Sequence, residues 1–187
     1  LKKMSEVIKH RGPDDDGIYI DREKGIGLVH RRLSIIDLKS GHQPMYSSDD
    51  SCVIIFNGEI YNYKNINAQL LKEGMKFKTN SDTETILNIY LKHGIEGFNL
   101  LNGMFAFAIY DKTKNKIILA RDNFGVKPIY YSFTTNGLTF ASEIKAILQN
   151  KDYNPELDYS AFNSFLTYRY NPSPQTLFKN IFKLKPG

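Results

Sequence analysis

The pattern of apolar and polar positions predicts short β-strands over much of the chain. Short apolar or β-branched runs bounded by turn residues indicate strands. They occupy residues 18–20, 27–29, 51–56, 104–110, 116–120, 128–133 and 138–141. The last four runs form two hairpins, because the polar turns 111–115 and 134–137 separate the members of each pair. The run at 51–56 leads into Asn57-Gly58, which we interpret as a tight turn.

The sequence predicts two helices between these strands and two more towards the end of the chain. Apolar residues recur at helical spacing over residues 66–73, and Gly74 supplies a stop. A second helix begins with an S-x-x-E capping box at Ser81 and Glu84 and ends at Gly94. Two further helices are expected, one capped by Ser142 and reaching about residue 149, and one over residues 158–168. Hairpins with helices between them favour an α+β fold of antiparallel sheets covered by helices.

Composition favours a folded domain of ordinary size. The chain has 187 residues, of which 41% are hydrophobic, so it can bury a sizeable core. Its net charge is +5, but acidic and basic residues are interleaved, and no basic run resembles a nucleic-acid-binding arm. The single cysteine, Cys52, excludes a disulfide framework and favours the cytoplasm. The apolar stretch at 103–110 is too short to cross a bilayer, so we expect neither a nucleic acid nor a membrane as partner.

Several common catalytic and binding motifs do not occur in the sequence. The four histidines lack H-E-x-x-H spacing, and one cysteine cannot form a zinc ribbon. The sequence also contains neither a G-x-x-x-x-G-K-[ST] loop nor a G-x-G-x-x-G loop for phosphate binding. We therefore expect no metal site and no cofactor in this chain.

Four short segments place charged and amide side chains beside turns or helix starts. They are H-R-G-P-D at 10–14, R-L-S-I-I-D at 32–37, F-N-G-E-I-Y-N at 56–62 and S-D at 81–82. Together with G-M-F-A-F-A at 103–108, A-R-D-N-F-G-V-K-P at 120–128 and A-S-E-I-K-A at 141–146, they resemble the glutaminase domain of glutamine-dependent asparagine synthetases. That domain is a class II glutamine amidotransferase. The resemblance covers nearly the whole chain and implies an N-terminal-nucleophile-hydrolase-like sandwich of two antiparallel sheets covered by helices.

The resemblance also implies a division of the chain and a partner. Residues 1–154 would form the amidotransferase domain without its N-terminal strand, and residues 155–187 a helix and linker towards a synthetase domain outside this sequence. That domain would use ATP and magnesium to amidate aspartate with ammonia released from glutamine. A homodimer is left open, and the resemblance agrees with a cytoplasmic location.

Glutamine offers three groups for recognition, and the resemblance assigns residues to each. The guanidinium of Arg32 would hold the α-carboxylate with two parallel N–H donors, and Asp82 would bind the α-ammonium. The side chain of Asn57 and the N–H of Gly58 would stabilise the oxyanion that forms when the amide is attacked. Glu59 would help to orient the substrate. Backbone groups of four further residues would line the pocket, namely Leu33, Ser34, Ile35 and Ile36.

Some of these residues also have simpler interpretations. Asp82 suits the first turn of a helix, where the helix dipole favours a negative charge. Asn57-Gly58 is a common turn pair. Arg11 is expected to have a structural role rather than a catalytic one.

The nucleophile of this family is a cysteine at the mature N-terminus, whose free α-amine serves as the base. No such residue precedes Leu1 in this sequence, and Cys52, in a predicted buried strand, does not suit the role. We therefore expect the chain by itself to bind glutamine at most. Two alternatives stay open: a catalytically silent glutamine-binding or interaction module, and the glutaminase domain of another class II enzyme, such as a sugar-amine or purine amidotransferase.

Overall fold

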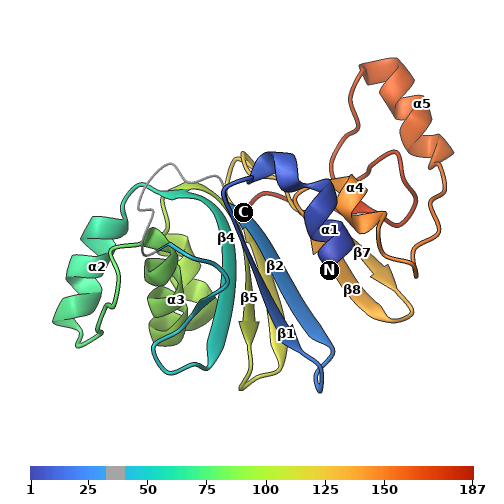
Figure 1. The fold of residues 1–187 in the computed structure, drawn as a ribbon. Coiled ribbons are helices and arrows are strands. Elements are labelled where there is room, and N and C mark those ends of the chain that lie inside the picture. Colours follow the sequence, from blue (N-terminus) through green and yellow to red (C-terminus); the bar gives the residue numbers. More distant parts are fainter. Residues whose placement is uncertain (33–40) are drawn as a thin grey trace.

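The computed structural model of the chain describes residues 1–32 and 41–187, and this part contains three antiparallel sheets (Figure 1). The first is a hairpin of β1 (Asp15–Asp21) and β2 (Ile26–Arg32). The second has the order β3-β4-β5-β6 and consists of β3 (Met45–Tyr46), β4 (Cys52–Ile60), β5 (Gly103–Asp111) and β6 (Lys116–Arg121). The third has the order β8-β7-β9 and consists of β7 (Tyr130–Thr134), β8 (Gly137–Ala141) and β9 (Phe182–Lys183). The two hairpins predicted after residue 103 are β5–β6 and β7–β8.

Helices cover these sheets. They are α1 (Lys2–Val7), α2 (Tyr63–Lys72), α3 (Asp82–His93), α4 (Ile144–Ile147) and α5 (Tyr159–Tyr168), with 3₁₀ turns at Lys9–Arg11 and Gly94–Leu100. Figure 1 shows α2 and α3 on one side of the four-stranded sheet and the β1–β2 hairpin on the other. Helix α1 lies against both β2 and α4. This arrangement confirms the predicted α+β fold of antiparallel sheets covered by helices.

Strand β4 divides its side chains between two hydrophobic clusters. Ile54 and Phe56 pack in the cluster formed with α2 and α3. Val53 packs in the other cluster with Leu28 of the β1–β2 hairpin. Because successive side chains of a strand point to opposite faces, Asn57 falls on the hairpin side. The alternating apolar residues of β4 therefore direct the Asn57 side chain to the hairpin side of the sheet.

The start of α3 differs in part from the predicted capping box. Ser81 caps the helix, since its hydroxyl accepts a hydrogen bond from the N–H of Thr83 at 3.2 Å. Glu84 does not complete the box. Its carboxylate instead accepts hydrogen bonds from the N–H groups of Lys78 and Thr79 in the preceding loop. Because the loop N–H groups occupy the Glu84 carboxylate, the cap from Ser81 forms but the reciprocal bond from Glu84 does not.

Helix α4 is shorter than predicted, and Ser142 is not its cap. The helix covers Ile144–Ile147, and Glu143 takes the cap position with an extended backbone. The Glu143 carboxylate is engaged by Arg11 at 3.2 Å and by Lys145 at 3.1 Å. The pair with Arg11 links this cap position to a distant segment, a contact that the local sequence does not show.

The last part of the chain packs back onto the third sheet. Strand β9 pairs with β7, and Ile181 is buried together with Ile147 and Tyr153. Helix α5 begins after Asp158, whose carboxylate caps it, in agreement with the helix expected at 158–168. The domain limits at residues 154 and 155 stay a prediction. Among the described residues, no helix is long and apolar enough to span a membrane.

Candidate functional site

Asn57 and Gly58 lie inside strand β4, so the predicted tight turn is wrong. Both residues continue the pairing with β5, opposite Ala106 and Phe105. Gly58 has a φ of 152°, and a Cβ atom there would lie 2.1 Å from the carbonyl oxygen of Met104. Only glycine tolerates this backbone conformation and this close approach. The N-G pair is thus held rigidly within a sheet.

The side chain of Asn57 is exposed and borders a cavity of about 120 Å³. The cavity lies between β2, β4, β5 and β8 and is lined mainly by apolar side chains, with His30 and Ser142 among the polar ones. An amide donor at the edge of a largely apolar hollow has the placement of a group that stabilises developing charge, because such interactions are stronger away from water.

Asp82 meets β4 at the same end of the strand. Its carboxylate Oδ2 accepts a hydrogen bond from the backbone N–H of Ile60 at 3.0 Å. Burial raises the pKa of the Asp82 carboxyl, and the negative charge of Glu59 raises it further. A bound ammonium group would oppose this rise, since a nearby positive charge favours the ionised form. The structure therefore brings together three of the predicted recognition residues at this end of β4: Gly58, Glu59 and Asp82.

Arg32 stands at the end of β2 and is half-buried. Its guanidinium lies against Gly41, where an added Cβ atom would come within 2.6 Å of Nη2. The positive charge of Arg32 contributes to lowering the pKa of Asp15, after the larger effect of the hydrogen bond from His42. Four predicted pocket residues, Leu33, Ser34, Ile35 and Ile36, lie outside the described part of the chain.

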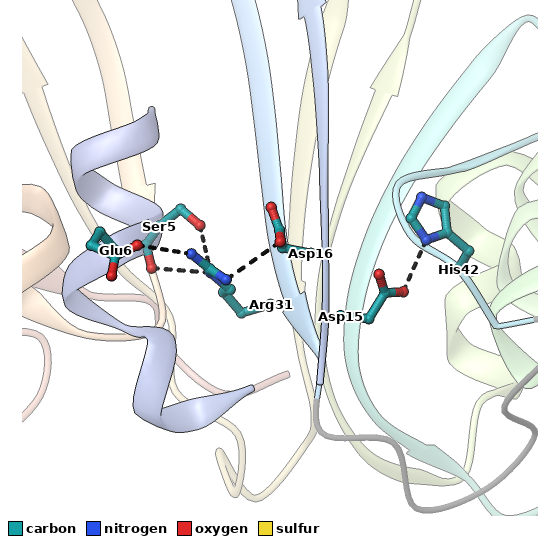
Figure 2. Close-up of polar contacts among 6 residues, drawn as sticks. All are labelled: Ser5, Glu6, Asp15, Asp16, Arg31 and His42. Atoms are coloured by element: carbon teal, nitrogen blue, oxygen red, sulfur yellow. Dashed lines mark hydrogen bonds and ion pairs between the residues drawn. The ribbon is translucent and has the colours of Figure 1, made fainter. Parts of the chain in front are cut away.

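Arg31, the neighbour of Arg32, serves a different purpose. Figure 2 shows Arg31 with Ser5, Glu6 and Asp16 on one side of the hairpin, and Asp15 with His42 on the other. Arg31 Nε donates to the Ser5 hydroxyl at 2.7 Å, and its guanidinium contacts Glu6 at 3.2 Å and Asp16 at 3.5 Å. Arg31 thus ties α1 to the hairpin.

Arg11 makes contacts that agree with the structural role expected for it, which stays a prediction. Its guanidinium pairs with Glu143 at 3.2 Å, and His10 contacts the same carboxylate at 3.1 Å. These contacts hold the 3₁₀ turn Lys9–Arg11 to the segment before α4. Burial would raise the pKa of Glu143, but the hydrogen bond from Lys145, followed by those from Arg11 and His10, holds this pKa below its usual value.

Two buried or half-buried polar residues near Asn57 escaped the sequence analysis. Gln43 accepts a hydrogen bond from the N–H of Phe56 at 2.6 Å and donates one to the Phe56 carbonyl at 3.0 Å. His30 Nε2 donates to the same carbonyl at 3.0 Å. A lone Gln before a proline carries no motif signal, so only the long-range contact reveals it.

Cys52 is unsuited to act as the nucleophile of this site. It is 1% exposed and faces α2 and α3 rather than the hairpin. Burial raises the pKa of its thiol, which disfavours the reactive thiolate. It is also five residues from Asn57 along one strand, which corresponds to roughly 17 Å at the usual rise of a β-strand. We conclude that the described cysteine is structural.

The stability of the fold is expected to fall in mild acid because of His30. Burial lowers the pKa of His30 to about 4, against an ordinary value near 6.5, although its bond to the Phe56 carbonyl opposes the shift. Below pH 6.5 the unfolded chain binds this proton first, so the free energy of unfolding decreases from pH 6.5 towards pH 4. The decrease between pH 7 and pH 5.5 should be about 1 kcal/mol from this group.

Urea denaturation of His30→Gln at both pH values tests this expectation. Glutamine keeps an N–H donor for the Phe56 carbonyl but does not titrate, so the variant should lose about 1 kcal/mol less stability on acidification. Equal losses in the variant and the original chain would show that His30 does not titrate as described.

Comparison with known proteins agrees with this geometry. A sequence model described as the glutamine amidotransferase domain matches residues 1–187. The chain belongs to this family. The family predicted from the four motifs is therefore confirmed.

Relatives of known name give the same assignment. Asparagine synthetase [glutamine-hydrolyzing] 1 of Bacillus subtilis is 41% identical over 187 residues, which are 100% of this chain and 29% of that protein. The putative asparagine synthetase [glutamine-hydrolyzing] 2 of Methanocaldococcus jannaschii is 41% identical over 204 residues, covering 99% of this chain and 39% of that protein. The chain thus spans between about three tenths and two fifths of the length of these relatives.

Among solved structures, the glutamine phosphoribosylpyrophosphate amidotransferase from B. subtilis, complexed with ADP and GMP, is similar in fold. The TM-score is 0.55 at 25% sequence identity, over 65% of this chain and 28% of that one. The allosteric regulatory enzyme of purine biosynthesis gives a TM-score of 0.53 at the same identity. These neighbours support the N-terminal-nucleophile-hydrolase fold that the resemblance implied.

Proposed function

We propose that this chain is the glutamine-hydrolysing domain of an asparagine synthetase, and that it releases ammonia for the amidation of aspartate elsewhere in a longer protein. The observation that carries the proposal is the end of β4. There Gly58 adopts a backbone conformation that only glycine tolerates, the Asn57 side chain is exposed, and the carboxylate of Asp82 accepts a hydrogen bond from the N–H of Ile60. The relatives named asparagine synthetase at 41% identity support the same function.

The backbone of β4 supports Gly58 as an oxyanion donor. Backbone groups alternate sides along a strand, and the N–H groups of Phe56 and Ile60 point away from β5, to Gln43 and Asp82. Gly58 lies midway between them, so its N–H turns to the same open edge. Phe105, its partner on β5, directs its own N–H and carbonyl to Asp122 instead.

The proposed reaction is attack on the side-chain amide of glutamine by the thiolate of an N-terminal cysteine, for which the free α-amine is the base. The amide carbonyl becomes an oxyanion that accepts hydrogen bonds from the Asn57 side chain and the Gly58 N–H. The nitrogen leaves as ammonia, taking up a proton, and a thioester remains. Water then hydrolyses the thioester to glutamate and restores the thiol.

Recognition of the amino-acid end falls to charged residues. Arg32 is proposed to bind the α-carboxylate, and Asp82, with the charge of Glu59 beside it, to bind the α-ammonium. The amidation of aspartate, with ATP and magnesium, is assigned to a synthetase domain outside this sequence. The greater length of the relatives supports such a partner.

Incubation of the full-length protein with glutamine, aspartate, ATP and magnesium tests the function. We expect glutamate and asparagine to form in equal amounts, and Cys52→Ala to change neither rate, because Cys52 is buried on the far side of β4. Glutamate without asparagine would indicate another class II amidotransferase. Glutamine binding without glutamate release would indicate a silent binding module, and either result would overturn the proposal.

A further inference from the structure

We propose that residues 41–43 form a positioning segment for glutamine hydrolysis, with Gln43 orienting the oxyanion donors and Gly41 orienting the guanidinium of Arg32. This inference rests on the proposed function and adds to it residues that no motif assigns. The segment lies between the β1–β2 hairpin and β4, which carry the two halves of the proposed site. The segment can therefore fix the position of Arg32 on the hairpin relative to the oxyanion donors on β4.

The side-chain amide of Gln43 pairs with one residue of β4 in the way that the backbone of a neighbouring strand would. It is 7% exposed, and its amide makes both hydrogen bonds that a strand partner would make with Phe56, at 2.6 Å and 3.0 Å. Strand β3 begins at Met45, which pairs with Ile54, so the backbone of Phe56 lies beyond the start of β3. The Gln43 side chain thus continues the sheet at the residue immediately before Asn57.

The hydrogen bonds of Gln43 to Phe56 act on Asn57 through the single peptide group that joins Phe56 to Asn57. The Phe56 carbonyl belongs to the same planar peptide group as the N–H of Asn57. Holding that carbonyl, with the additional bond from His30 at 3.0 Å, fixes the orientation of the residue that carries the side-chain donor. Oxyanion donors contribute through such preorganisation, and a shift of about 1 Å in a positioned group can cost about 100-fold in rate.

The same segment is held to the hairpin by two independent contacts. The Gln43 carbonyl lies so close to Gly17 that a Cβ atom there would come within 2.0 Å of it. His42 Nδ1 donates to the Asp15 carboxylate at 2.9 Å, the contact drawn in Figure 2. The segment therefore contacts β1 through the Gln43 carbonyl and the His42 side chain, while the Gln43 side chain is hydrogen-bonded to β4.

Gly41 places the Arg32 guanidinium. A methyl group at this position would meet Nη2 of Arg32 at 2.6 Å and Cζ at 3.0 Å. These atoms are the far end of a flexible side chain, so the added methyl group would displace the guanidinium rather than the backbone. Gly41→Ala should consequently displace the carboxylate clamp while leaving the β4 donors in place.

The test compares three variants of one short segment in the full-length protein, with steady-state glutamine hydrolysis measured as glutamate release. Gln43→Met keeps the chain length but neither hydrogen bond, and should lower kcat about 10- to 100-fold with little change in KM. Gly41→Ala should raise KM for glutamine several-fold with little change in kcat. His42→Ala removes the contact of the segment with Asp15 and should lower kcat less than Gln43→Met does, because the Gln43 carbonyl still packs against Gly17.

A change in kcat alone at Gln43 and in KM alone at Gly41 would indicate positioning of separate groups. General loosening of the fold would instead alter both constants in every variant. Gln43→Glu is the second variant if Gln43→Met fails to fold, because a carboxylate still accepts from the Phe56 N–H but cannot donate to its carbonyl. An unchanged kcat in the Gln43 variants, alongside a reduced kcat in Asn57→Ala, would overturn this inference alone. An unchanged kcat in Asn57→Ala would instead overturn the proposed function.

Discussion

Replacement of Asn57 by alanine is expected to lower glutamine-dependent turnover by about 100- to 1,000-fold, with little change in the Michaelis constant for glutamine. The reason is that the Asn57 side chain is proposed to meet negative charge that exists only in the transition state. An interaction of that kind contributes to kcat and not to ground-state binding. Removing one oxyanion donor typically raises the barrier by about 2.7–4 kcal/mol.

The control for this variant is asparagine formation from free ammonia, which does not require the glutamine site. Asn57 lies within β4 opposite Ala106, so a thermal melt must first show that the strand is intact. If Asn57→Ala impairs the reactions with ammonia and with glutamine equally, Asn57 is a structural residue and the oxyanion assignment is wrong.

The second large effect is expected from Arg32→Lys, which should weaken the apparent affinity for glutamine by at least about 30-fold. Lysine keeps the charge but loses the two parallel donors that match a carboxylate. Disrupting a desolvated charge pair costs roughly 2–5 kcal/mol. Turnover at saturating glutamine should change much less, because the α-carboxylate is unaltered by the reaction.

The chain contains a matched control for this substitution. Arg31 is the adjacent residue of β2, but its guanidinium binds Ser5, Glu6 and Asp16 on the other side of the hairpin. Arg31→Lys should therefore leave the Michaelis constant for glutamine unchanged while lowering the melting temperature. An equal Michaelis constant in Arg32→Lys and the unaltered protein would remove Arg32 from the site.

Features that depend on local sequence were predictable. The β5–β6 and β7–β8 hairpins have polar turns between strands, and Ser81 marks the start of α3 by its own hydroxyl. The family followed from motifs, because the order of several short segments is far more specific than any one of them. These signals are all contained in stretches of a few residues.

Features that depend on contacts between distant segments were not predictable. Asn57-Gly58 has the composition of a turn, yet pairing with β5 keeps it in a strand. Glu84 could complete a capping box, but the preceding loop takes its carboxylate. Gln43 acts thirteen residues away on Phe56, and no local pattern encodes that bond.

A competition between two nitrogen sources tests the central claim most directly. The full-length protein and its Asn57→Ala variant are supplied with aspartate, ATP, magnesium, amide-¹⁵N-labelled glutamine and unlabelled ammonium, and the ¹⁵N fraction of the asparagine is measured by mass spectrometry. We predict that the ratio of ¹⁵N to ¹⁴N in the asparagine falls at least about 100-fold in Asn57→Ala while asparagine from ammonium continues to form. The same ¹⁵N fraction in both proteins would contradict the assignment of glutamine hydrolysis to this end of β4.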